Sequence, residues 1–307
     1  MSPSQPSRPS GPSQAAFPPA EASGAATPRQ AAGVLHVVAT PIGNLRDITL
    51  RALEILGAAD AVVCEDTRVT GKLLAAHGLR CALVSYHEHN ADRRRPELLR
   101  RLAAGETLAL VADAGTPLIS DPGYKLVRAA QDASAAVRAV PGPSAAVSAL
   151  AVAGLPTDRF LFQGFLPHKT KARRDTLAEL ANVPASLVVY ESPQRLGASL
   201  ADMAAVLGDR EAAVVRELTK RFEESVRATL PELAEHYGRT TAKGEIVVVI
   251  APPAPAEPAG EAELDERLRT ALAEHSLRDA VAEVTRATGL PRKRVYTRAL
   301  ALRDAEA

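Results

Sequence analysis

Three short loops rich in glycine and proline are the part of the sequence best suited to holding a ligand. The longest, Asp113–Gly123 (DAGTPLISDPG), follows the apolar run 107–112, and the other two cover 38–45 (VATPIGNL) and 140–145 (VPGPSA). Glycine lets the backbone approach a ligand closely and proline fixes φ, so such loops present backbone groups in a set arrangement. An ordinary tight turn between a strand and a helix is the alternative interpretation of each loop taken alone.

The spacing of these loops narrows the class of ligand. The Gly-Lys-Ser/Thr ending of a P-loop is missing, and so is the Gly-x-Gly-x-x-Gly fingerprint of dinucleotide-binding folds. Parallel strands bring their carboxyl ends to one edge of a sheet, so three such loops predict one shared site there. We expect a neutral or zwitterionic ligand in that site rather than a triphosphate.

Acidic side chains at two strand ends are candidates for proton transfer. Glu65 and Asp66 follow the apolar segment 61–64, and Asp113 opens the longest loop. A carboxylate in such a place can accept a proton from a nucleophile, so all three are candidate catalytic residues. Asp113 competes for the role of base, but we favour a cofactor-orienting function for it. The alternative for the first two is structural, because they could cap the next helix and pair with Arg68.

Histidine and cysteine usage does not favour a metal or redox site. His87 and His89 would share one face of an extended segment, but no third ligand lies nearby in the sequence. We therefore interpret them as solvated loop residues. Cys64 and Cys81 lack metal-ligand or redox spacing, and we expect small buried apolar residues in a reducing compartment.

Contact with nucleic acid would have to come from local basic clusters, because the 307-residue chain carries a formal net charge of only +1. The segment 168–174 (HKTKARR) is expected to open a helix, where cations oppose the helix dipole, and this favours a phosphate-facing role. The segments 93–95 and 292–298 are further candidates, with a solvated face as the alternative. Five Phe, five Tyr and no Trp make an extended stacking platform unexpected, so any recognition of nucleic acid should rest on phosphates and shape. The candidate phosphate-contacting residues are Lys169, Lys171, Arg173, Arg174, Arg292, Lys293 and Arg294.

The pattern of elements predicts an α/β protein with a small helical module at its C-terminal end. Strand and helix patterns alternate over 34–153, which favours a mostly parallel sheet covered on both faces. A second α/β domain is expected over 154–251 and helices over 263–307, the last two of which have a helix-turn-helix outline.

The remaining segments are expected to lack a core. Residues 1–33 are rich in Pro, Ser and Ala and are expected to be disordered, and 252–262 is expected to be a stiff Pro/Ala linker. No run of about eighteen apolar residues and no secretory h-region occurs, so we expect a cytoplasmic protein without a membrane segment.

Six segments, taken together and in order, closely resemble the ribosomal RNA small subunit methyltransferase I family of the tetrapyrrole-methylase superfamily. The resemblance covers about residues 34 to 302. The segments are ATPIGNL (39–45), CEDTR (64–68), DAGTPLISDPG (113–123), PGPSA (141–145), YESPQR (190–195) and ELTKRFEE (217–224).

The resemblance implies a two-domain, class III methyltransferase fold with S-adenosylmethionine in the cleft between the domains. It also implies 2′-O-methylation of the ribose of a decoding-centre cytidine in 16S rRNA of the 30S subunit, by a cytoplasmic homodimer that needs neither DNA nor a metal. Carried over by motif, the cofactor-binding residues would be Pro41, Ile42, Gly43, Ala114, Gly115, Thr116, Ile119, Ser144, Ala145, Tyr190, Glu191 and Leu218.

Two departures from the tetrapyrrole-specific members favour the rRNA branch. Those members carry Gly-x-Gly-Pro-Gly in the first loop, where this chain has TPIG (40–43), and their Gly-Asp-Pro aspartate corresponds here to Thr116. A methyltransferase for a tetrapyrrole or another small molecule is the first alternative, and it predicts dispensable basic clusters. A non-enzymatic RNA-binding or assembly factor is the second, and it predicts no affinity for the cofactor.

Overall fold

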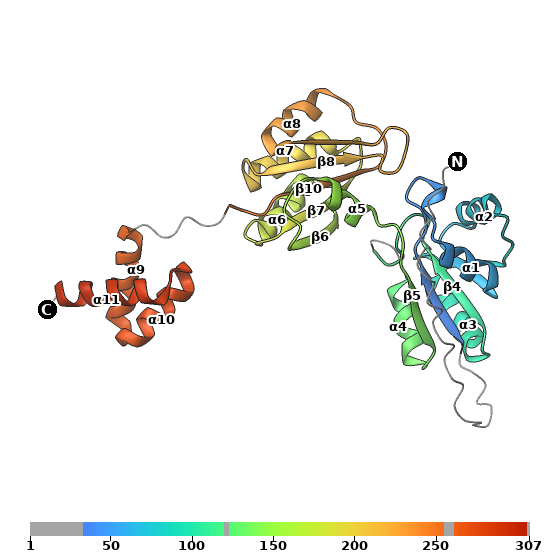
Figure 1. Ribbon diagram of the computed structural model, residues 1–307, viewed down its shortest axis with the longest axis horizontal. Helices are drawn as coiled ribbons and strands as arrows, with labels where there is room; N and C mark the ends of the chain where they lie inside the picture. Colours follow the sequence, from blue (N-terminus) through green and yellow to red (C-terminus); the bar gives the residue numbers. More distant parts are fainter. Residues whose placement is uncertain (1–32, 120–122, 255–260, 306–307) are drawn as a thin grey trace, which may run out of the picture.

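The computed structural model describes residues 33–119, 123–254 and 261–305 and arranges them as two α/β lobes and a separate group of helices (Figure 1). The expected disordered extension up to residue 32 and the centre of the expected linker, 255–260, lie outside the described residues. The same holds for residues 120–122 of the longest loop.

The first lobe is built on a five-stranded sheet in the order β3-β2-β4-β1-β5, and every strand pairing in it is parallel, as the alternating pattern predicts. Its strands are short and almost continuously apolar, which suits a sheet buried on both faces. The elements are β1 (Val34–Val38), η1 (Leu45–Asp47), α1 (Leu50–Ala58), β2 (Ala61–Cys64), α2 (Thr67–Ala76), β3 (Leu83–Ser85), α3 (Ala91–Ala103), β4 (Thr107–Val111), α4 (Tyr124–Asp132) and β5 (Ala136–Val140).

Alternate residues of these strands feed two separate cores. Helices α1 and α2 cover one face, where Leu56 and Leu74 pack against Val38 and Val111. Helices α3 and α4 cover the other face through residues such as Leu98 and Leu126. The two helices that follow β1 and β4 therefore lie on opposite faces of the sheet, although β1 and β4 are neighbours.

The second lobe contains a mixed sheet in the order β6-β7-β10-β8-β9, in which only β6 and β7 are parallel. Helices α6, α7 and α8 cover one face, and α5 covers the other. The elements are α5 (Ala145–Val152), β6 (Phe160–Phe165), α6 (Thr170–Leu180), β7 (Ser186–Glu191), α7 (Leu196–Leu207), β8 (Glu211–Arg216), β9 (Glu224–Thr229), α8 (Leu230–Arg239) and β10 (Ile246–Ile250).

One helix lies elsewhere than the sequence pattern indicates. We expected residues 144–153 to close the first domain, but α5 packs on the second sheet, with Ala149 and Leu150 against Val188 and Val249. Because α5 is almost entirely apolar, no polar face in its sequence shows which sheet it covers.

The three C-terminal helices have a core of their own, formed by residues such as Leu268, Val281 and Val295. They are α9 (Glu261–Glu274), α10 (Leu277–Thr288) and α11 (Arg292–Ala305), and Figure 1 shows them apart from both lobes. Gly289 ends α10 with a φ of +66°, a conformation that glycine adopts without steric cost. No helix in the described parts of the chain is long and apolar enough to cross a membrane.

Candidate functional site

The carboxyl edge of the first sheet opens into a crevice between β1 and β4. The chain leaves β1 toward one face of the sheet and leaves β4 toward the other, so the two connections diverge above neighbouring strands. Open α/β sheets bind ligands at such a switch point. The sequence places its first two glycine- and proline-containing loops here.

Hydrogen bonds brace the three loops against one another. Thr40 and Gly115 form an isolated antiparallel bridge, with N···O distances of 2.9 and 3.1 Å. The buried Thr40 hydroxyl also donates to the Ala112 carbonyl at 3.1 Å, and the Thr116 hydroxyl donates to the Pro143 carbonyl at 3.0 Å. The loops after β1, β4 and β5 therefore act as one unit.

The backbone of the loop after β4 adopts conformations that few residues tolerate. Gly115 has a φ of +80°, and a Cβ built on it would lie 3.3 Å from Cγ2 of Ile42. Leu118 has a φ of +75°, which is uncommon for a bulky residue. Such strain persists only where the surroundings hold it, and it gathers at functional sites.

A turn of the second lobe faces this crevice with similar strain. Glu217 and Thr219 have φ values of +52° and +66°, and between them Leu218 is nearly buried. Lys220 runs against the first loop so closely that a Cβ on Gly43 would lie 2.6 Å from its Cγ and Cε. The turn after β8 thus contacts the loop after β1 and joins the two lobes.

Ion pairs hold that turn in place. The Lys220 amine donates to Glu217 at 2.8 Å and to Glu245 at 3.1 Å, and the Glu245 backbone N–H donates to Glu217 at 3.0 Å. Burial opposes the charged amine, but these two carboxylates raise the pKa of Lys220 above its usual value. The Lys220 hydrogen bond, with help from the Glu245 N–H, lowers the pKa of Glu217. Lys220 and Glu217 are therefore both charged at neutral pH.

A buried carboxylate ends β7 at the same place. Glu191 is 2% exposed and accepts hydrogen bonds from the Ser199 hydroxyl and, at 2.8 Å, from the Ser192 backbone N–H. Arg195 lies 3.4 Å from it and also donates to the carbonyls of Leu166 and Pro167. A buried charge needs such partners, and here they fix the carboxylate at the end of the strand.

These elements enclose a cavity of about 390 Å³ between the lobes. Its wall is mainly apolar, with a few hydroxyls, two carboxylates and the N-terminal end of α5. Apolar walls with few polar groups are typical of cofactor sites, and a free helix N-terminus suits a carboxylate. The lining residues are Ile42, Ala114, Gly115, Thr116, Ile119, Ser144, Ala145, Phe165, Tyr190, Glu191, Ser192, Pro193, Leu218, Gly244, Glu245, Ile246 and Val247.

Ten of the twelve residues that the resemblance assigns to the cofactor line this cavity. Pro41 and Gly43 do not, although they flank Ile42, which does. The structure therefore gathers into one wall residues that are as far apart in the chain as Ile42 and Leu218.

Seven lining residues were absent from our sequence-based set. Ser192 and Pro193 belong to the quoted segment 190–195 and could have been carried over with it. Gly244 and Glu245 directly precede β10, and Ile246 and Val247 begin it. This segment reaches the site only because β10 runs antiparallel to β7. Phe165 lies at the end of β6, the strand parallel to β7.

The three candidate catalytic acids lie beside the cavity rather than in its wall. Asp66 caps α2 by accepting the Arg68 N–H at 2.8 Å, and its carboxylate is hydrogen-bonded by the Arg68 guanidinium, which lowers the pKa of Asp66 to about 2. The structural interpretation thus describes the contacts of Asp66. Asp113 accepts the Asp66 N–H at 3.1 Å and directly precedes Ala114 of the wall, while Glu65 is half-buried.

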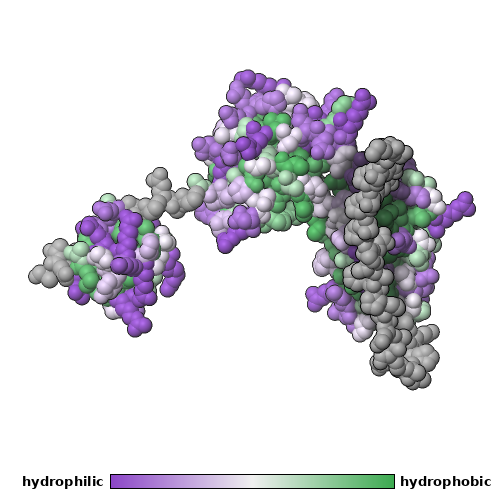
Figure 2. Space-filling view, viewed as in Figure 1, coloured by the Kyte–Doolittle hydropathy of each residue, from purple (hydrophilic) through white to green (hydrophobic). Residues whose placement is uncertain are grey.

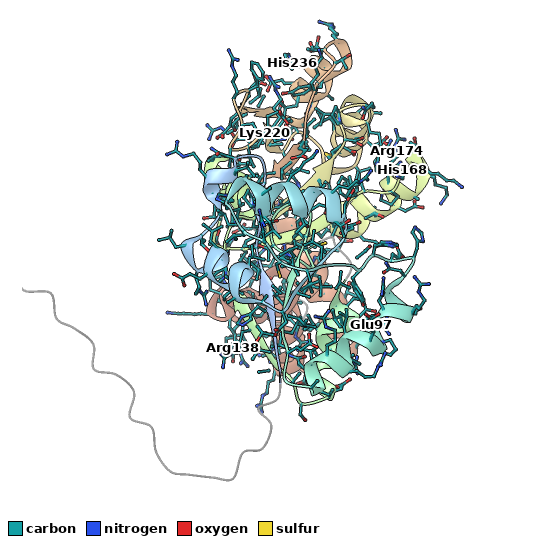
Figure 3. All side chains as sticks on the ribbon, turned by 90° about the vertical axis from the view of Figure 1, so that its right-hand side faces the viewer. Glu97, Arg138, His168, Arg174, Lys220 and His236 are labelled. Atoms are coloured by element: carbon teal, nitrogen blue, oxygen red, sulfur yellow. The ribbon has the colours of Figure 1, made fainter. Side chains whose placement is uncertain are left out.

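The basic segment 168–174 opens α6, as expected, and Figure 3 shows His168 and Arg174 together on that side of the second lobe. Lys169 and Lys171 are exposed, and Arg174 is about half exposed while it pairs with Asp202 at 2.6 Å. Our expectation for Arg173 was wrong. Its side chain is 5% exposed and donates to Asp202 at 2.7 Å, so it positions the helix instead of facing a ligand.

The basic segment 292–298 likewise contains both exposed cations and a cation that is held by an ion pair. Arg292, Lys293 and Arg294 are exposed at the start of α11, as a contact with phosphates requires. Arg298 instead holds α11 to α9 through two 2.6 Å hydrogen bonds to Asp265.

In the described parts of the chain, no three His, Cys, Asp or Glu side chains lie close enough together to hold a metal ion. His87 and His89 stack edge to face, and the amide of Asn90 holds the loop around them by accepting the His87 backbone N–H.

Two family models match the chain. Residues 34–234 match the tetrapyrrole (corrin/porphyrin) methylases, and residues 258–303 match the RsmI C-terminal HTH domain. The first match runs from β1 into α8 and so covers every strand of the two sheets except β10, and the second coincides with the C-terminal helices.

Curated relatives and solved structures agree with these matches. The chain is 50% identical over 272 residues to the ribosomal RNA small subunit methyltransferase I of Mesorhizobium japonicum, covering 88% of this chain and 92% of the relative. It is 46% identical to the protein of the same name from Xylella fastidiosa, covering 86% and 98%. In fold it is similar to uroporphyrin-III C-methyltransferase from Thermus thermophilus complexed with S-adenosylhomocysteine, with a TM-score of 0.51 and 22% identity over 71% of this chain and 97% of that one.

These similarities agree with the structure. The chain combines a parallel sheet with three loops at its switch point, a second lobe that closes the cavity and a C-terminal group of helices. The chain belongs to the ribosomal RNA small subunit methyltransferase I family of the tetrapyrrole methylases.

Proposed function

We propose that the protein transfers a methyl group from S-adenosylmethionine to the ribose 2′-hydroxyl of cytidine 1402 in 16S rRNA. The observation that carries this proposal is the cavity between the lobes, where ten residues assigned by family motif converge. Relatives that cover most of the chain at 43–50% identity are named rRNA small subunit methyltransferases, which supports rRNA as the substrate.

The wall of the cavity fits S-adenosylmethionine group by group. The N–H groups at the start of α5, where Ser144 is the cap without a side-chain cap bond, suit its carboxylate. The exposed carboxylate of Glu245 supplies negative charge for the ammonium or the sulfonium. Apolar side chains such as Ile42 and Leu218 suit the adenosyl group.

When bound, S-adenosylmethionine supplies an electrophilic methyl group on its sulfonium. The task of the protein is then to align the acceptor oxygen with that methyl group and to exclude water, which is worth about 7–11 kcal/mol in well-oriented cases. The braced loops around Thr40 and Gly115 give the rigidity that this alignment requires.

A ribose hydroxyl is a weak nucleophile, and we propose Asp113 as the group that accepts its proton. Asp113 borders the cavity wall, and Asp66 holds it by a backbone N–H at 3.1 Å. Asp66 itself suits the role less well, because its depressed pKa makes it a weak base at neutral pH.

The exposed cations at the start of α6 are proposed to bind the phosphates of the rRNA. Lys169 has no acidic partner among the described residues, and Lys171 has only Asp175 at 2.9 Å, on an exposed helix face. Exposed pairs of this kind contribute little and exchange readily for a phosphate. The exposed residues 292–294 of α11 are proposed to extend this surface.

Association of two copies in the cytoplasm is part of the proposal. Figure 2 shows apolar surface on the second lobe, in the region of α5, where Val147 and Val152 are about half exposed. Apolar surface of this kind typically meets a partner. Sedimentation of the wild type and of Val147→Glu should give a dimer and a monomer, respectively.

The experiment that tests the function uses labelled S-adenosylmethionine with 30S subunits or 16S rRNA that lack the modification, followed by mapping of the labelled nucleotide. We expect a single product, a 2′-O-methylated cytidine. Label on a base, or transfer to a free porphyrinoid and none to rRNA, would contradict the proposal.

A further inference from the structure

Phe222 is a large aromatic side chain that the fold leaves in solvent beside the cavity. It is 64% exposed, and no hydrophobic core of the described residues includes it. It lies four residues after Leu218 of the cavity wall, so their Cα atoms are at most about 14 Å apart. Packing within the fold therefore does not explain why a phenyl ring stands at this position.

The segment that carries Phe222 is a rigid turn. The Lys220 N–H donates to the Glu217 carbonyl at 3.0 Å, and the Glu223 N–H donates to the Lys220 carbonyl at 3.2 Å. The Glu223 carboxylate accepts the Thr219 N–H at 2.6 Å. The turn is also fixed to the first loop, because Lys220 packs against Gly43. Figure 1 shows the β8–β9 connection reaching toward the first lobe, and Figure 3 labels Lys220 within it.

The charges of this turn are arranged so that a cation stays available next to the ring. The Glu223 side chain is engaged by Thr219, and Arg216 donates to Glu224. Arg221 has no acidic partner among the described residues, and its guanidinium lies 5.4 Å from the centroid of the Phe222 ring. The turn therefore presents an aromatic face and a positive charge together.

A phenyl ring beside a guanidinium suits a nucleotide, because the ring can stack on the base and the guanidinium can bind the neighbouring phosphate. Unstacked RNA bases stack on aromatic side chains and on guanidinium planes, and this contact tolerates any base because every base has a π face. A ribose that reaches the cavity must bring its base out of the RNA stack, and that base needs a new stacking partner.

We infer that Phe222 and Arg221 form the stacking site for a nucleobase of the substrate RNA, at or next to the methylated nucleotide. This inference rests on the proposed function and adds residues that the family motifs did not assign to any role. The strained turn from Glu217 to Glu223 then serves both partners, with Leu218 toward the cofactor and Phe222 toward the RNA.

The experiment compares Phe222→Leu, Phe222→Tyr and Arg221→Met with the wild type, and Phe160→Leu serves as the matched control. Phe160 is a similarly exposed aromatic residue, at the opposite end of β6 from Phe165 of the cavity wall. The readouts are kcat/KM for methyl transfer to 30S subunits or 16S rRNA that lack the modification, and the Kd of S-adenosylhomocysteine from calorimetry.

We expect Phe222→Leu to lower kcat/KM by about 5- to 150-fold, the range for loss of one base–aromatic stack. Phe222→Tyr should stay close to the wild type because it keeps the ring, and Arg221→Met should show an intermediate loss. The Kd of S-adenosylhomocysteine should be unchanged in all variants, and Phe160→Leu should behave as the wild type.

Three results would overturn the inference. If the wild type is active and Phe222→Leu has the same kcat/KM, the stacking site is rejected while the proposed function stands. Weaker binding of S-adenosylhomocysteine by Phe222→Leu would mean that the ring acts on the cofactor pocket. A wild type that binds S-adenosylhomocysteine but methylates no rRNA would overturn the proposed function, and the stacking site with it.

Discussion

The carboxylates around the cavity differ in what holds them, and this difference separates structural acids from one suited to chemistry. Asp66 caps α2 and pairs with Arg68, which lowers the pKa of Asp66 to about 2. Asp113 is exposed and accepts a backbone N–H beside the cavity wall. The contacts therefore favour Asp113 over Asp66 as the proton acceptor.

Replacing Asp113 by Asn should slow methyl transfer by about 10²-fold or more, the usual contribution of a positioned base. The Asn carbonyl can still accept the Asp66 N–H, so the loop and the affinity for S-adenosylhomocysteine should be retained. Asp66→Asn is the matched control, because asparagine also caps helices well. Single-turnover rates that are the same for Asp113→Asn and the wild type would exclude Asp113 as the base.

Glu217 makes the stability of the turn depend on pH in a defined direction. Lys220 and the Glu245 N–H lower the pKa of Glu217 below its usual 4.5, so the ionised carboxylate stabilises the fold. That stabilisation is fully present above about pH 4.5 and is lost as the pH falls through the lower, folded-state pKa.

Glu217→Gln should therefore lower the midpoint of thermal unfolding at pH 7, and the difference from the wild type should shrink as the pH falls below 4.5. Thermal unfolding followed by circular dichroism from pH 7 to pH 3 checks this expectation. A difference that stays constant over this range would show that the ion pair does not contribute.

The elements that build the site are short loops locked to one another at the switch point of a parallel sheet. The Thr40–Gly115 bridge and the Thr116–Pro143 hydrogen bond join three loops that follow three different strands. The loops can join only because β1, β4 and β5 are adjacent and parallel, with β1 in the centre.

Gly115→Ala tests this bracing against a matched glycine. Gly115 and Gly78 both have positive φ, +80° and +68°, so alanine should destabilise the protein by about 1–2 kcal/mol at either position. Only at Gly115 would the new Cβ crowd a neighbour, Ile42, at 3.3 Å, while at Gly78 nothing lies within 4 Å.

We therefore expect Gly115→Ala to weaken S-adenosylhomocysteine binding by about tenfold, and Gly78→Ala to leave it unchanged. Calorimetry on both variants measures the two affinities. Equal affinities in the two variants would show that the close approach of Ile42 to Gly115 does not shape the pocket.

Much of the fold and of one wall of the cavity could be predicted from the sequence, for reasons that are local. Apolar runs such as 61–64 and 107–111 and the loops after them have clear strand and turn chemistry. Pairing between strands that are distant in the sequence could not be predicted from such local patterns. The antiparallel placement of β10, which brings Gly244 to Val247 into the cavity, depends on pairing between distant strands.

Two misplacements have the same cause. Nothing in the apolar sequence of α5 distinguishes one sheet from the other, so its packing on the second lobe was missed. Arg173 is one of several adjacent cations, and only the position of Asp202 on α7 shows that it is buried.

On the scale of the whole molecule, the two lobes supply the cofactor cavity, and the exposed cations of α6 and of the separate C-terminal helices are candidate RNA contacts. The net charge of +1 makes the affinity for RNA depend on where the cations are exposed. Lys169 and Lys171 are exposed at one place, and residues 292–294 at another.

Changing both Lys169 and Lys171 to Ala should weaken RNA binding and flatten the slope of log K against log salt by roughly one to two. The control is the double change of Lys125 and Arg128 on α4, which also removes two exposed charges. Filter binding at several salt concentrations gives both slopes. An unchanged slope for the α6 variant would remove this helix from the RNA interface.

The central claim is that one cavity between the lobes holds the methyl donor, and calorimetric titration of the full chain with S-adenosylhomocysteine tests it most directly. The account predicts one site per chain, with affinity reduced by Gly115→Ala and retained by Asp113→Asn. The absence of binding by the wild type, or binding that Gly115→Ala leaves untouched, would contradict it.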